Sequence, residues 1–131
     1  MVILNLHDKR PIYVQLVDGI KEQVIKGILK PGDQILSIRQ LAGQLSITPN
    51  TVSRAYQELE RQKVIISVKG KGNYINDVPN FKRSEEKMEE LKKLLTQLCI
   101  EWNFAGYNRG ELIEVIDEIY NNLKKEESTC Q

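Results

Sequence analysis

The chain has 131 residues, of which 40% are hydrophobic and 28% charged, as is usual for a globular protein. No apolar run approaches the roughly 20 residues that a membrane-spanning helix needs, so the sequence excludes such a helix. The first residues lack the basic region and small-residue cleavage site of a secretory signal. Two cysteines, Cys99 and Cys130, are too few for a disulfide framework, and we expect a cytoplasmic protein.

The net charge of +1 hides an uneven distribution along the chain. Residues 1–83 carry 13 Lys and Arg against 7 Asp and Glu, whereas residues 84–131 carry 6 against 11. A basic first part indicates contact with a polyanion, and the acidic second part must then serve another purpose. Charge scattered over solvated faces would give the same totals, so the charge does not decide the matter alone.

Two helices are predicted in the first third of the chain. Pro11 suits a first helical turn, and apolar residues then recur every four positions from Ile12 to Ile28. The proline and glycine in residues 30–33 should end this helix. Ser37 and Gln40 fit a capping box, in which each side chain satisfies the other residue's backbone amide, and a short helix should follow.

A third helix should begin after a tight turn at residues 46–47, with Thr48 as its cap and Pro49 in its first turn. One side of this helix is apolar and should pack in a core. The other side presents amide, hydroxyl and guanidinium groups near the helix start, because about 100° per residue separates successive side chains. Such groups can bond to base edges, and a helix fits the major groove of DNA. These residues are Asn50, Ser53, Arg54 and Gln57.

An isolated helix of this kind could be an ordinary polar surface helix, but the neighbouring segments indicate that it reads DNA. The short helix, the turn and the third helix form a helix-turn-helix pattern, with small Ala42 at the crossing and Val52 at the interface. Two β-branched and aromatic runs follow, at 64–68 and 73–76, around a basic, glycine-rich tip at 69–72. The order of these features predicts a winged helix-turn-helix.

Two more helices are predicted beyond a boundary at residues 77–80. The first is capped by Ser84 and carries a heptad-like apolar seam, and the second starts with a capping box at Asn108. The 48 residues from 84 to 131 bury too little surface to be stable alone. A second copy would supply a partner, and packing onto the chain's own first helix is the alternative. The expected interface residues are Met88, Leu91, Leu95, Leu98, Trp102, Leu112, Ile116 and Ile119.

Four segments together resemble one bacterial family. They are residues 11–15, 31–42, 48–60 and 70–72, and they resemble the GntR family of transcription regulators over about residues 9–76. The Pro-Asn-Thr-Val motif and the short tail are similar to its YtrA-like subfamily. The resemblance implies a homodimer whose binding to operator DNA usually represses transcription. It places phosphate and base contacts on Ser37, Arg39, Thr48, Asn50, Thr51, Ser53 and Gly70.

Two positions depart from the family pattern. Many members outside the subfamily have arginine where Pro49 and Ser53 stand, so those base contacts do not transfer, and Arg54 is a candidate for the role. Ser46 stands in the turn where helix-turn-helix proteins often have glycine. A left-handed backbone at this serine would cost about 1 kcal/mol.

The predicted fold is mainly α with a small β-hairpin. A winged helix-turn-helix DNA-binding domain (1–80) precedes a two-helix C-terminal dimerisation region (81–131). The recognition helix, 48–62, should enter the major groove of an inverted-repeat operator, with the basic wing, 69–72, near the minor groove. The predicted DNA-binding residues are Ser37, Arg39, Thr48, Pro49, Asn50, Thr51, Ser53, Arg54, Gln57, Lys69, Gly70 and Lys71.

No constellation of residues indicates an enzyme, a metal site or a cofactor. Residues 70–72 are superficially like a phosphate-cradling loop, but a strand rather than a helix follows them. His7 is the only histidine and has no partner at metal-ligand spacing. Cys99 and Cys130 lack a redox motif. We therefore expect no catalytic residue, no metal and no cofactor.

Two questions stay open at this point. The short tail leaves little room for an effector pocket, which typically takes ~300 Å³ or more, and no effector is named by the sequence. The alternative function is a winged-helix protein-interaction module with little direct DNA contact. Basic residues near the wing argue against that alternative: Lys69, Lys71, Lys82 and Arg83.

Overall fold

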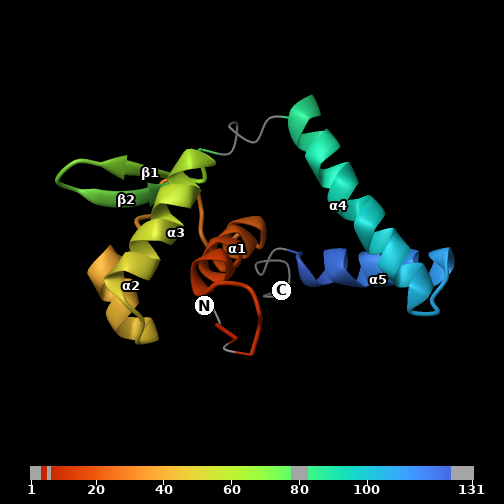
Figure 1. Ribbon diagram of the computed structural model, residues 1–131. Helices are drawn as coiled ribbons and strands as arrows, with labels where there is room; N and C mark the ends of the chain where they lie inside the picture. The colour runs from red at the N-terminus through yellow and green to blue at the C-terminus, as the bar shows by residue number, and fades with distance from the viewer. Residues whose placement is uncertain (1–3, 6, 78–82, 125–131) are drawn as a thin grey trace, which may run out of the picture. The chain divides into compact units, whose positions relative to one another are not determined.

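The computed structural model describes residues 4–5, 7–77 and 83–124, and the chain divides into two compact units (Figure 1). Residues 78–80 of the boundary predicted at 77–80 lie outside the described residues, as do Lys82 and Cys130. No described helix is long and apolar enough to cross a membrane. The first unit contains α1 (Ile12–Ile25), α2 (Ile38–Leu45), α3 (Pro49–Arg61), β1 (Ile65–Val68) and β2 (Gly72–Ile75). The second unit contains α4 (Glu85–Phe104) and α5 (Arg109–Asn122).

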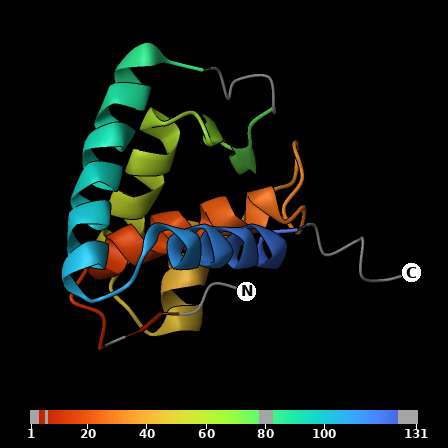
Figure 2. The same cartoon turned by 90° about the vertical axis from the view of Figure 1, so that its right-hand side faces the viewer.

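Helix α3 lies at the centre of the first unit, because it packs against α1, α2 and β1. In Figure 2, α1 runs across the view and α3 stands steeply against it. The apolar face predicted for α3 is buried, since Val52, Ala55 and Leu59 are each 0% exposed. Ala42 belongs to the same buried cluster, so the predicted contact between the second and third helices is confirmed.

The predicted helix starts are formed by the predicted side chains. Ser37 Oγ accepts a hydrogen bond from the Gln40 amide at 3.2 Å, and Gln40 Oε1 accepts one from the Ser37 amide at 2.9 Å. Thr48, Ser84 and Asn108 each accept a hydrogen bond from the backbone amide three residues further on, at the starts of α3, α4 and α5, and Asn108 forms a capping box with Glu111. Ser46, between α2 and α3, is left-handed with φ 57 and ψ 44. The helix-turn-helix therefore accepts a serine where glycine would carry no strain.

Helix α1 ends at Ile25, before the predicted end at residues 30–33. Gly27 adopts φ +78, which stops the helix, and Ile28 is 42% exposed. The physical reason is that glycine adopts this left-handed conformation without steric cost, so the helix ends before the proline and glycine of residues 30–33 are reached. Helix α4 ends at Phe104.

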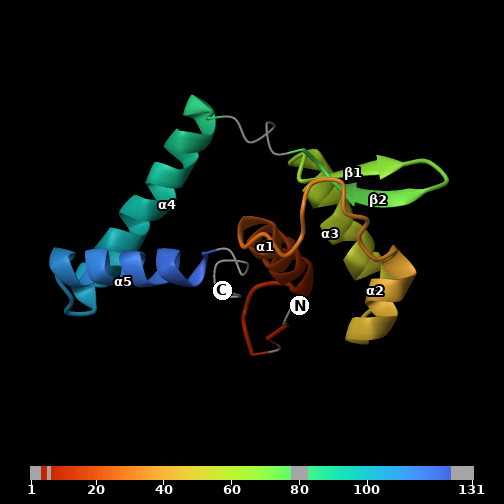
Figure 3. The same cartoon turned by 180° about the vertical axis from the view of Figure 1, so that it is seen from behind.

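The hairpin is antiparallel, with Ile65 opposite Ile75. A third segment, which was not predicted, joins it. The Ile35 amide donates to the Asn73 carbonyl at 3.0 Å, and the Gly32 amide donates to the Ile75 carbonyl at 2.9 Å. This segment belongs to the connection between α1 and α2, drawn in orange in Figure 3. The connection fastens the hairpin to the helices.

In the second unit, no described residue is buried. Met88, Leu91, Leu95 and Leu98 are 45–50% exposed along α4. Trp102 is half-buried, and its Nε1 donates to the Asn108 carbonyl at 2.8 Å, which closes the turn between the two helices. Cys99 is a half-buried free thiol. The apolar faces of α4 and α5 are therefore largely uncovered.

Candidate nucleic-acid interface

The start of α3 is held rigid by its own residues. Pro49 occupies the first helical position, where its missing amide costs nothing. Thr48 Oγ1 lies 3.4 Å from the Thr51 amide and 2.9 Å from the Thr51 hydroxyl oxygen. The predicted phosphate-contacting threonines are therefore adjacent to each other at the positive end of the helix dipole.

The polar face of α3 lies on the side opposite its buried residues. Asn50, Arg54 and Gln57 are exposed, and Ser53 is half-buried between them. The structure brings these side chains together on one exposed helix face. An amide, a hydroxyl and a guanidinium can each bond to a base edge in the major groove.

Arg54 does not extend freely into solvent. Its Cζ lies 4.0 Å from the centroid of the Tyr13 ring, at the start of α1. A guanidinium that stacks on an aromatic face keeps its N–H donors free in the plane of the group. Tyr13 therefore restricts the orientation of Arg54 without using its hydrogen-bond donors. Sequence reasoning missed this contact, because only the packing of α1 on α3 creates it.

The wing presents basic residues at an exposed tip. Lys69, Gly70 and Lys71 are exposed, and Gly70 adopts φ +79, a left-handed conformation that favours glycine. The Lys71 amide donates to the Val68 carbonyl at 2.9 Å, which closes the turn. The ammonium groups of both lysines thus lie on the outside of the hairpin.

Two side chains anchor the wing tip through its backbone. Gln34 Nε2 and the Tyr74 hydroxyl both donate to the Lys71 carbonyl, at 3.0 and 3.1 Å. A Cβ on Gly72 would lie 2.9 Å from Gln34 Nε2, so this glycine permits the close approach. The role of Gln34 was not predicted, since it is 37 residues from Lys71 in the sequence.

The start of α2 carries two more of the predicted DNA-binding residues, Ser37 and Arg39, and both are exposed. The Tyr56 hydroxyl, on α3, donates to the Leu36 carbonyl at 2.6 Å, immediately before the cap of α2. Burial raises the pKa of Tyr56 to about 12, so the phenol stays protonated and can donate. This hydrogen bond fixes the start of α2 relative to α3.

One further side chain, Gln15, organises the residues before α1. It is 5% exposed, and its Oε1 accepts from the Asn5 amide at 2.8 Å. Its Nε2 donates to the carbonyls of Asn5 and Arg10, each at 3.1 Å. A buried glutamine within an apolar stripe was not recognised as an anchor from the sequence.

Among the described residues, no group of three or more His, Cys, Asp or Glu could hold a metal ion.

The buried α3, its exposed polar start and the basic hairpin define a winged helix-turn-helix protein of the DNA-binding class. The family model described as bacterial regulatory proteins, gntR family, matches residues 12–75. The chain is 40% identical to the HTH-type transcriptional repressor YtrA of Bacillus subtilis (strain 168), over 95% of each chain. It therefore belongs to the GntR family, and it is a transcription regulator rather than an enzyme.

Solved structures agree with this assignment. A transcriptional antiterminator from Listeria monocytogenes EGD-e is similar with a TM-score of 0.89 and 43% identity, over 94% of this chain and 92% of that one. The DNA-binding domain of AraR, solved in complex with the operator ORR3, is similar with a TM-score of 0.50 and 25% identity. That match covers 56% of this chain and 88% of the other.

Proposed function

We propose that this protein represses transcription as a homodimer that binds an inverted-repeat operator in the cytoplasm. The observation that carries the proposal is the arrangement of α3, whose one face is buried while Asn50, Arg54 and Gln57 are exposed. The similar YtrA is named a repressor, and the similar AraR domain was solved on operator DNA. Both relatives support this reading.

The exposed residues divide into two roles at the operator. Asn50, Ser53, Arg54 and Gln57 face the major groove and read base edges. Hydroxyls and backbone at helix starts set the register on phosphates rather than reading sequence. That second group comprises Ser37, Thr48 and Thr51, whereas Pro49, which has no N–H to donate, can contact the DNA only through its ring. Arg39 contacts a phosphate or a guanine edge, and Lys69, Gly70 and Lys71 lie along the minor groove.

The dimer forms through the second unit, in this proposal the region 81–131. None of its described residues is buried, although α4 carries an apolar seam over several turns. Such a seam is stable in water only when another surface covers it. A second copy of α4 and α5 covers it with the residues Met88, Leu91, Leu95, Leu98, Trp102, Leu112, Ile116 and Ile119. Two-fold symmetry then presents two copies of α3, from the 1–80 domains, to two half-sites.

Analytical sedimentation of the variant Leu95→Glu tests the dimer. Gln97→Glu is the control, because Gln97 is an exposed polar residue of the same helix. Leu95→Glu should give monomers and weaken operator binding by about 10²-fold or more, since the second half-site contact is lost. The control should stay dimeric. Trp102, the only tryptophan, should report the change by its fluorescence. Dimers of Leu95→Glu with unchanged affinity would contradict the proposed interface.

Selection of bound fragments from random duplex DNA tests the operator. The proposal expects an enriched inverted repeat whose half-sites lie about one helical turn, or a multiple of it, apart. Enrichment of a single half-site without symmetry would contradict the symmetric dimer. No enrichment of any sequence would favour the protein-interaction alternative.

A further inference from the structure

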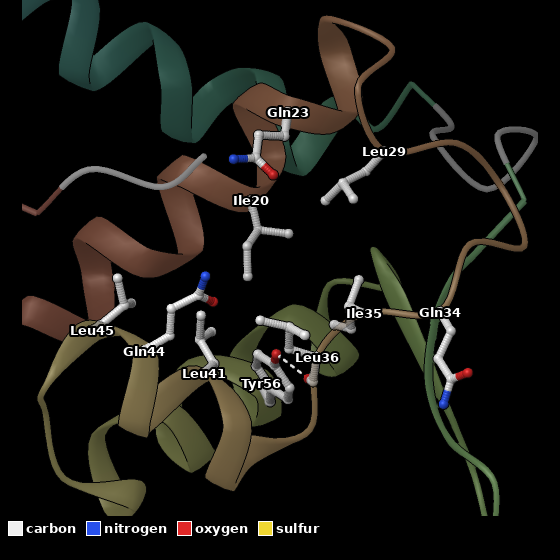
Figure 4. Close-up of a pocket in the computed structure, with 10 residues that line it drawn as sticks. All are labelled: Ile20, Gln23, Leu29, Gln34, Ile35, Leu36, Leu41, Gln44, Leu45 and Tyr56. Carbon is white, nitrogen blue, oxygen red and sulfur yellow. Dashed lines mark hydrogen bonds between the residues drawn. The ribbon is translucent and has the colours of Figure 1, made fainter.

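A pocket of about 380 Å³ lies within the first unit, between α1, the segment before α2, and α2 itself (Figure 4). Small-molecule sites in proteins typically have volumes of about 300 to 1,000 Å³. The walls are mainly aliphatic, and no charged residue lines them. The aliphatic side chains are Ile20, Leu29, Ile35, Leu36, Leu41 and Leu45.

Two glutamine amides supply polar groups to this pocket. Gln23 extends from α1 and Gln44 from α2, and Figure 4 shows both reaching toward Ile20. Neither amide hydrogen-bonds to another described residue. The third glutamine, Gln34, instead donates to the Lys71 carbonyl of the wing. An unpaired amide offers two donors and one acceptor, so Gln23 and Gln44 can bind a ligand that both accepts and donates.

We propose that this pocket binds an uncharged, mainly apolar small molecule that carries an amide or a comparable hydrogen-bonding group, and that the occupied pocket weakens DNA binding. Aliphatic walls favour an apolar body. A charged ligand would lose its hydration without meeting an opposite charge. The two amides then orient the polar group of the ligand.

The pocket shares residues with the DNA-reading helices. Leu41 lies in the core, 8% exposed, and Tyr56 reaches the pocket from α3. The Tyr56 hydroxyl holds the Leu36 carbonyl at 2.6 Å, directly before the cap of α2 (Figure 4). A ligand that spreads α1 and α2 apart therefore shifts the start of α2 relative to α3. This effect on DNA rests on the proposed operator binding.

The binding test uses two probes of nearly equal shape and follows the full chain by nitrogen-15 NMR without DNA. Benzamide is neutral and carries an amide, whereas benzoate is charged. Benzamide should cause saturable shifts at pocket residues, including the side-chain amides of Gln23 and Gln44, with a Kd of about millimolar or tighter. Benzoate should bind at least tenfold more weakly.

Leu36→Trp fills the pocket, and Ile28→Trp is its matched control. Both native side chains are 42% exposed, so either position accommodates a larger side chain at the surface, but only Leu36 lines the pocket. Leu36→Trp should weaken benzamide binding at least tenfold, and Ile28→Trp should leave it unchanged. Equal binding of benzoate, equal binding to Leu36→Trp, or shifts confined to α4 and α5 would overturn the site.

A separate measurement tests the coupling to DNA. Saturating benzamide should weaken binding of the wild-type chain to its selected operator at least threefold, without an effect on Leu36→Trp. Unchanged operator affinity with a filled pocket would overturn the regulatory part of the proposal. A chain that binds benzamide but no DNA at all would instead refute the proposed function.

Discussion

Arg54 on the recognition helix stacks on Tyr13 of α1, with Cζ 4.0 Å from the ring centroid. The contact joins the helix proposed to read DNA to the helix that supports it. A cation over an aromatic face contributes roughly 0.5–1 kcal/mol at an exposed site. Tyr13 therefore acts as a positioning residue for Arg54.

Loss of the ring should weaken DNA binding only while Arg54 is present. Tyr13→Leu should lower operator affinity by about two- to fivefold, as expected for 0.5–1 kcal/mol, and Tyr13→Phe should not. In an Arg54→Ala background, Tyr13→Leu should have no further effect. Fluorescence anisotropy with a labelled operator measures the four combinations. An equal loss in both backgrounds would show that Tyr13 acts independently of Arg54.

The wing should loosen when its anchor is removed. Gln34→Ala deletes the hydrogen bond to the Lys71 carbonyl, a net loss of roughly 0.5–1.5 kcal/mol. We expect faster amide exchange at the wing tip and operator affinity lower by up to about tenfold. Ser67→Ala, an exposed position on β1, should change neither quantity. An unchanged wing in Gln34→Ala would mean that Tyr74 holds the tip alone.

Stability should depend on Tyr56 at high pH. Burial raises the pKa of Tyr56 to about 12, from 10 in the unfolded chain, so folding favours the neutral phenol. Its contribution is complete below pH 10 and is lost as the pH rises from 10 to about 12. We expect the free energy of unfolding to fall by about 1–2 kcal/mol more in the wild type than in Tyr56→Phe. Urea denaturation at each pH measures this free energy. An equal fall in the two proteins between pH 10 and 12 would contradict a buried, neutral Tyr56.

Ser46→Gly should stabilise the first unit. The serine has φ 57 and ψ 44, a conformation that disfavours side chains with a Cβ. Glycine removes this strain, but its greater flexibility in the unfolded chain offsets part of the gain. The free energy of unfolding should therefore rise by about 0.5–1 kcal/mol. Ser67→Gly provides the control, because an extended strand position gains nothing from glycine and should lose stability. Urea denaturation of both variants gives the comparison, and a destabilised Ser46→Gly would refute the strain.

Elements governed by local chemistry were predictable from the sequence. The caps at Ser37, Thr48, Ser84 and Asn108 depend on residues three apart, and each was found where expected. The buried face of α3 follows from helical periodicity in the same way. The order of these elements along the chain, together with the family resemblance, then predicted the winged helix-turn-helix fold.

Contacts between distant segments were not predictable in this way. Tyr13 stacks on Arg54, and Gln34 reaches Lys71, only because the packed helices bring them together. The end of α1 was misplaced because Gly27, whose left-handed backbone stops the helix, stands inside the predicted apolar stripe. The pocket between α1 and α2 likewise has no sequence signature, since its walls come from four separate segments.

The central claim is that the exposed start of α3 binds duplex DNA, and a salt titration tests it most directly. The intact chain is mixed with its selected operator between 50 and 200 mM salt, with Asn50→Ala measured beside it. With six to ten phosphate contacts the affinity should fall by about 10³ to 10⁵ over this range, because released counterions dominate binding. Asn50→Ala should keep that salt dependence while losing roughly 1–3 kcal/mol of preference for the operator over random DNA. A wild-type chain without salt-sensitive binding to any duplex would contradict the account.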